Sequence, residues 1–179
     1  DLYQLLCAAI QCNNARLLPP TDTTEHWTIL GDPTEAALSV VALKGGIDLE
    51  SEVQHMPRIR ELPFDSRRKR MATIHRNLNT TSNSADNIVY VKGAPRETLA
   101  LCTQIWCNGC PIPLTNDVRA QILAGNDDYA RQGLRVFAGW RSSPTDAQPG
   151  PDETVYSSVK VFDCVALFPA DPRCFRARP

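Results

Sequence analysis

Residues 59–76, IRELPFDSRRKRMATIHR, give the clearest indication of how the strands of this chain pair. Its two flanks, Ile59–Phe64 and Met71–Arg76, have the apolar and β-branched character of strands, and the polar residues 65–69 lie between them. Two such runs joined by a short polar connection are typical of a β-hairpin. The sequence therefore predicts antiparallel pairing in this part of the chain.

Helices and strands are mixed on both sides of this hairpin. Capping residues, apolar periodicity and turn signals predict helices over Asp1–Cys12, Pro33–Leu43, Arg96–Leu101 and residues 115–131, and strands over His26–Leu30, Ile88–Val91, Leu134–Trp140 and Val159–Phe168. The Asn-Gly pair between Cys107 and Cys110 predicts a second hairpin. The stretches 77–86 and 142–153 are expected to be loops. Because no regular βαβ alternation occurs, we expect an α+β fold, an antiparallel β-sheet flanked by helices.

Composition limits the classes of protein that need to be considered. The 179 residues are 42% hydrophobic and 22% charged, which fits one domain covering residues 1–179. A net charge of −1 gives no overall field for nucleic acid or an anionic membrane, so we expect neither as a partner. No apolar run approaches membrane-spanning length. The ends look cut rather than finished, which predicts a domain excised from a larger protein.

Several familiar sites have no signature in this sequence. It contains neither a P-loop nor a Gly-x-Gly-x-x-Gly motif. The three His residues lack metal-ligand spacing. The seven Cys residues are expected to be free thiols, as in a reducing cytosol. Cys107 and Cys110, with Cys102 nearby, leave a thiol or zinc module as an alternative, although the Asn-Gly turn itself explains the spacing of the pair.

A more specific hypothesis comes from the residues that accompany the basic run at positions 67–70. Phe64 precedes this run, and Lys92 ends another strand at a glycine. An aromatic face for a base, with cations for phosphates, is what a nucleotide requires. The run alone is weak evidence, because the solvated end of a hairpin would have the same composition.

Four motifs in order strengthen the hypothesis: GDPTEAAL at 31–38, LPFDSRRKRM at 62–71, VKGAP at 91–95 and GLRV at 133–136. Together they resemble the successive signatures of the nucleotide-binding (N) domain of P-type cation-transporting ATPases, and most closely the type II, calcium-pump-like branch. The resemblance covers nearly the whole chain. It implies an ATP-binding site made of six residues: Glu35, Phe64, Lys69, Lys92, Gly93 and Arg135.

At the adenine end, the resemblance implies that Phe64 stacks on the base, that Glu35 approaches its amino group and that Gly93 lets the backbone come close. Two of these residues have structural alternatives. Glu35 is the third residue of a helix that Asp32 caps, so its carboxylate could bond the backbone of Asp32 in a capping box. Phe64 could belong to the core.

For the three cations, the resemblance implies that Lys69 and Lys92 line the nucleotide cleft and that Arg135 reaches the phosphates. A neighbouring arginine could replace Lys69, and Arg135 could point to solvent. Arg96 departs from the family, which usually has Glu after Lys-Gly-Ala-Pro. We expect this reversal to change the charge balance of the cleft, and not the fold.

The resemblance also implies what the chain does within a larger protein. In this family the phosphoryl group passes to the Asp of an Asp-Lys-Thr-Gly-Thr segment, which this chain lacks. The chain would hold ATP, as Mg-ATP, and present the γ-phosphate to that Asp in a neighbouring phosphorylation domain, with an actuator domain as a further partner. It would be a cytoplasmic domain of an integral membrane pump, inactive alone, with no catalytic residue or metal ligand of its own. The alternative is a regulatory or interaction module with the same fold and no nucleotide.

Overall fold

The computed structural model describes residues 2–78, 87–142 and 163–170. The helices are α1 (Leu2–Gln11), α2 (Pro33–Lys44), α3 (Leu49–His55), α4 (Pro95–Leu99) and α5 (Asn116–Arg131). The strands are β1 (Arg16–Leu18), β2 (Thr28–Leu30), β3 (Arg58–Asp65), β4 (Arg70–Arg76), β5 (Asn87–Gly93), β6 (Gln104–Cys107), β7 (Cys110–Pro113), β8 (Arg135–Ser142) and β9 (Asp163–Ala170).

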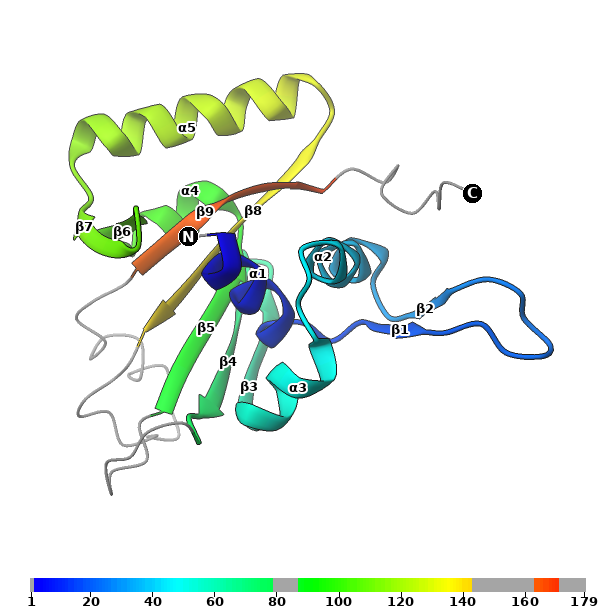
Figure 1. Cartoon of the computed structure of the whole chain (residues 1–179). Coiled ribbons are helices and arrows are strands. Elements are labelled where there is room, and N and C mark those ends of the chain that lie inside the picture. The colour runs from blue at the N-terminus through cyan, green and yellow to red at the C-terminus, as the bar shows by residue number, and fades with distance from the viewer. Residues whose placement is uncertain (1, 79–86, 143–162, 171–179) are drawn as a thin grey trace.

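Seven of the strands form one sheet in the order β3-β4-β5-β8-β9-β6-β7. Neighbours in this sheet are antiparallel, apart from the parallel pair β6 and β9. Helices cover both faces of the sheet, with α4 and α5 on one side and α1 to α3 on the other (Figure 1). The expected α+β class is confirmed.

Side chains of strand β4 pack alternately into a hydrophobic core on each face of the sheet. Ala72 and Ile74 point to the face where α4 and α5 pack, and both side chains are buried. Met71 points to the opposite face and packs with Ala8 of α1. Thr73 lies on that same face and donates from Oγ1 to the carbonyl of Gln11 at 3.1 Å. Because successive side chains of a strand alternate between the faces, a strand buried on both sides is almost continuously apolar.

The neighbouring strand β5 has the same alternation, and it ends with a charge. Val89 and Val91 join the core beneath α4 and α5, whereas Ile88 and Tyr90 join the core beneath α1. The next residue on the α1 face is Lys92. The alternation therefore places an ammonium group on the face where α1 and α2 lie.

Both predicted hairpins are present in the large sheet. Asp65 pairs with Arg70 at the end of the first, and Cys107 pairs with Cys110 at the end of the second. Asn108 and Gly109 have φ angles of 51° and 83°, as a type I′ turn requires. Helix α3 and strand β1 have no counterpart in the prediction. Strand β1 pairs with β2 to form an arm that extends away from the sheet (Figure 1).

Some predictions fall outside the described residues. These are most of the expected loops over 77–86 and 142–153, the first residues of the strand expected over 159–168, and the exit after residue 170. Within the described residues, no helix combines the length and apolar composition needed to cross a membrane.

Candidate functional site

The antiparallel order brings four strand ends together at one edge of the sheet. Arg70, the first residue of β4, pairs with Gly93, the last residue of β5, and Gly93 pairs in turn with Ala138 near the start of β8. The end of β3 lies beside the start of β4. Residues from four different strands therefore meet at this edge.

Helix α2 begins beside this edge of the sheet. Its N-cap, Asp32, accepts hydrogen bonds through Oδ1 from the backbone N–H groups of Thr34 at 2.8 Å and Glu35 at 3.2 Å. Pro33 occupies the first helical position, where its missing N–H costs nothing. This start fixes the direction in which Thr34 and Glu35 leave the helix.

A cleft of about 570 Å³ lies between the start of α2 and the strand ends. Asp32, Thr34 and Met71 contribute to its walls. The six residues named from the sequence all line this cleft: Glu35, Phe64, Lys69, Lys92, Gly93 and Arg135. Residues separated by up to 100 positions in the chain are thus brought to one place.

Phe64 presents an exposed aromatic ring to this cleft. Its side chain is 62% exposed, so it does not belong to the core. Leu62 pairs with Ala72 and Asp65 with Arg70, so two residues of β3 stand opposite one residue of β4. This bulge contains Pro63, which has no N–H to donate to a ladder. The bulge interrupts the alternation and leaves the ring of Phe64 accessible.

Lys92 and Glu35 form a buried ion pair in the wall of the cleft. Lys92 is only 6% exposed, and its Nζ lies 2.9 Å from Oε1 of Glu35. The other oxygen of Glu35 accepts from the backbone N–H of Asn14 at 2.9 Å. The Glu35 carboxylate is therefore bonded to Lys92 and Asn14, and not to the backbone of Asp32 as a closed capping box would require.

Lys69 lies at the hairpin end with a φ angle of 51°. Its Nζ is 2.5 Å from Oε1 of Glu97, the third residue of α4. This hydrogen bond from Lys69 is the main cause that holds the pKa of Glu97 below its ordinary value. Among the residues of the basic run, Lys69 is the one that lines the cleft.

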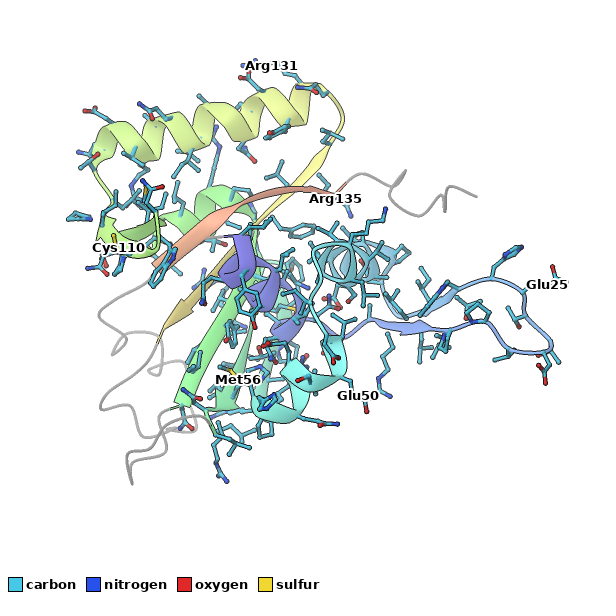
Figure 2. The ribbon with its side chains drawn as sticks, viewed as in Figure 1. Glu25, Glu50, Met56, Cys110, Arg131 and Arg135 are labelled. Carbon is cyan, nitrogen blue, oxygen red and sulfur yellow. The ribbon has the colours of Figure 1, made fainter. Side chains whose placement is uncertain are left out.

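Arg135 lies at the first residue of β8, on the side of α2 (Figure 2). It donates from Nη1 to the hydroxyl oxygen of Thr34 at 3.0 Å. Burial alone would raise the pKa of Asp32, but the bonds from Thr34 and Glu35 and the charge of Arg135 together lower it. Arg135 is thus held against the start of α2 while it remains exposed to solvent.

Gly93 has a packing role that the sequence did not reveal. A Cβ on this residue would lie 2.5 Å from the carbonyl oxygen of Lys69 and 2.6 Å from the Cβ of Arg70. No real Cβ tolerates such contacts. The close pairing of β4 and β5 at the edge of the cleft therefore depends on glycine here.

Arg96 does not reach the cleft. Its Nη2 donates to both carboxylate oxygens of Asp127, at 2.9 and 2.7 Å, and so joins α4 to α5. Any effect of Arg96 on the charge balance of the cleft would therefore be indirect, through its charge near Glu97. Glu97, the next residue, is the one that meets a cleft cation.

The sequence reasoning missed two contributors to the site. Thr34 belongs to the motif at 31–38, and its hydroxyl holds Arg135. Glu97 lies in the first turn after Pro95, which places it beside the end of β5. Both residues lie within or next to the quoted motifs, so their proximity in sequence is the feature that could have indicated a place in the site.

A larger groove of about 900 Å³ lies elsewhere, between α1, α3 and β1. None of its lining residues is Phe, Tyr or Trp. The guanidinium of Arg58 in its wall donates to the carbonyls of Gln11 and Asn13 and to Glu61. The one aromatic side chain in its lining, His75, is only 1% exposed and offers no face to a base, so the smaller cleft is the better candidate.

Five cysteines are free thiols: Cys7, Cys12, Cys102, Cys107 and Cys110. Cys102 is buried and bonds to the carbonyl of Thr98, whereas Cys107 and Cys110 flank the turn between β6 and β7. In the described part of the chain, no three His, Cys, Asp or Glu side chains gather as a metal site would require. His75 is buried in β4 with Nδ1 against the carbonyl of Met56.

Comparison with known proteins assigns the chain to a class. The family described as P-type ATPase, cytoplasmic domain N, matches residues 1–157. The chain therefore belongs to the P-type ATPase family and corresponds to its N domain.

Individual relatives agree with this assignment. A protein of Mycobacterium tuberculosis named "Probable cation-transporting ATPase F" is 35% identical over 154 residues, which are 86% of this chain and 16% of that protein. A calcium-transporting ATPase of Listeria monocytogenes is 31% identical over 144 residues, covering 80% of this chain and 15% of its own length. The human calcium-transporting ATPase type 2C member 2 is 34% identical over 110 residues, 62% of this chain and 11% of that protein. The chain thus spans about one sixth or less of the length of these relatives.

Proposed function

We propose that the chain binds ATP in the cleft at the start of α2, as the nucleotide-binding part of a cation-transporting ATPase. The observation that carries this proposal is that an exposed aromatic ring and three cations line the same cleft. Phe64 would stack on the adenine, because an accessible ring at the rim of a cleft offers a face to a planar base. Lys69, Lys92 and Arg135 would attract the phosphates.

Glu35 suits the amino group of the base. It already accepts bonds from Lys92 and Asn14, but a carboxylate has about four lone-pair positions and can accept a further donor. Gly93 brings bare backbone to the same wall of the cleft.

The chain would contribute positioning and not bond making. It contains no Asp-Lys-Thr-Gly-Thr segment to receive a phosphoryl group. Presenting the γ-phosphate to an aspartate of a phosphorylation domain is an entropic and electrostatic task, for which a firm hold on the adenine and phosphates is sufficient. Magnesium would enter with the substrate as Mg-ATP. The phosphorylation and actuator domains of the same pump would be its partners, on the cytoplasmic side of the membrane.

The affinity of the isolated chain for ATP should be modest. One base stack contributes about 1–3 kcal/mol, and a charge-assisted hydrogen bond contributes about 1.5–3 kcal/mol. Association itself costs several kcal/mol in lost freedom. The remainder corresponds to a dissociation constant of about 0.1–10 mM.

An NMR titration of the 179-residue chain with ATP tests the proposal. Signals of Phe64, Lys92 and Gly93 should move as ATP rises to about 10 mM. Phe64→Ala should weaken the binding of ATP and adenosine about tenfold, as loss of one stack predicts. Trp27→Ala is the matched control, because Trp27 is 60% exposed and lies outside the cleft. Absence of shifts near Phe64, or an equal loss in both variants, would contradict the proposed site.

A further inference from the structure

The three cations of the cleft have different partners. Lys92 is paired with a buried carboxylate, and Arg135 bonds a neutral hydroxyl. Lys69 is paired with Glu97, and these two side chains are 56% and 31% exposed. Of the two lysine ion pairs, the one with Glu97 is the pair that solvent and a ligand can reach.

The pair between Lys69 and Glu97 joins two segments that the backbone fixes together. The N–H of Lys69 donates to the carbonyl of Asp65 at 2.7 Å, which closes the hairpin end. The carbonyl of Lys69 accepts from the N–H of Ala94 at 2.9 Å, and Ala94 is the N-cap of α4. Glu97 follows in the first turn of that helix. The ammonium and the carboxylate are therefore held close by the fold itself.

Glu97 also decides the charge of the cleft. The charged lining residues are the cations Lys69, Lys92 and Arg135 and the carboxylates Asp32 and Glu35. They leave a surplus of one positive charge, which Glu97 cancels through Lys69. The lowered pKa of Glu97 keeps it ionised near neutral pH.

We propose that Glu97 competes with the phosphates of the nucleotide for Lys69 and so reduces the preference of the cleft for a charged nucleotide over an uncharged nucleoside. This inference rests on the proposed binding of ATP. A phosphate that takes the ammonium of Lys69 must replace the carboxylate of Glu97. Adenosine, which has no phosphate, has nothing to gain from Lys69.

The test compares ATP with adenosine, titrated separately at one fixed ionic strength into the chain and into Glu97→Gln. The substitution keeps the size of the side chain and removes its charge. An exposed ion pair is worth up to about 1 kcal/mol, so ATP should bind Glu97→Gln about two- to fivefold more tightly. Adenosine should bind both proteins equally. Asp128→Asn is the control, because it removes the same charge from an ion pair with Arg131 outside the cleft.

A second background separates competition for Lys69 from a general repulsion. In Lys69→Gln, the further change Glu97→Gln should no longer improve ATP binding, since the contested ammonium is gone. An equal improvement in both backgrounds would overturn the proposal in favour of simple charge repulsion. An unchanged ATP affinity in Glu97→Gln would overturn it as well. A chain that binds neither ligand with shifts near Phe64 would instead contradict the proposed function.

Discussion

Replacing Lys92 by Met should cost far more stability than replacing Lys69 by Met. Both substitutions remove an ammonium that is paired with a carboxylate, at 2.9 Å for Lys92 and 2.5 Å for Lys69. The difference lies in burial. Lys92 is 6% exposed, and its loss leaves the carboxylate of Glu35 without a counterion in a largely buried place. Glu97, in contrast, remains open to water when Lys69 is lost.

The expected magnitudes follow from this difference. Breaking a buried pair from one side costs about 3–5 kcal/mol. Glu35 keeps its hydrogen bond from Asn14 and retains some contact with solvent, so we expect a loss at or just below the lower end of that range, about 2–3 kcal/mol. Breaking the exposed pair should cost less than about 1 kcal/mol. Removing both charges, in Lys92→Met with Glu35→Gln, should recover part of the loss, because no unpaired charge remains.

Urea unfolding of the chain and its variants measures these differences, with the midpoint and slope fitted together for each protein. Circular dichroism before unfolding establishes that each variant is folded. If Lys92→Met loses no more free energy of unfolding than Lys69→Met, burial does not govern the strength of these pairs. A double variant that loses the full sum of the two single losses would show that Lys92 and Glu35 are not coupled.

Two further predictions concern the backbone around the cleft. Gly93→Ala should lower the free energy of unfolding by about 1–3 kcal/mol, because its Cβ would meet the carbonyl of Lys69 at 2.5 Å. Gly125→Ala, in open space on α5, should instead raise the free energy of unfolding by about 0.5–1 kcal/mol. Equal effects of the two substitutions in urea unfolding would refute the packing argument. Asp32→Ala should cost about 0.5–2 kcal/mol at neutral pH by loss of the helix cap. Because the pKa of Asp32 is lower in the folded chain than its reference value of 3.8, its stabilisation is complete above that value and is lost as pH falls through the folded pKa. Unfolding curves of the two proteins should therefore converge in acid, and a constant gap would contradict a role for the ionised carboxylate.

The sequence predicted the parts of the fold that local rules determine. Helix α2 has an acidic N-cap, Pro at its first position and glycines after its end, and it begins at Pro33 as expected. The Asn108-Gly109 turn is equally local. Helix α3 was missed because its seven residues bury none of their side chains, so no apolar period marks it. The parallel pairing of β6 with β9 joins segments far apart in the chain, which no local pattern specifies.

The sequence motifs identify the residues of the candidate site. They do not predict which contacts each of these residues makes in the fold. The bulge that exposes Phe64 depends on the register between β3 and β4. The capping pattern suggested that Glu35 bonds the N-terminus of its own helix, whereas the side chain bonds Lys92, which is 57 residues away in the sequence. Such pairs depend on which strand ends meet at the edge of the sheet, and that is a property of the whole topology.

The partners of the three cations also indicate how freely each could turn toward a phosphate. Arg135 bonds a neutral hydroxyl, and its charge also interacts with the carboxylate of Asp32, so turning toward an anion would give up part of that attraction. Lys69 would have to leave an exposed carboxylate, which costs little in water. Lys92 would leave Glu35 buried and unpaired, so it is best suited to attract a phosphate while remaining bonded to Glu35. The stability of the buried ion pair thus limits how far Lys92 can move toward a ligand, whereas the exposed side chains of Lys69 and Arg135 can move without leaving a buried charge unpaired.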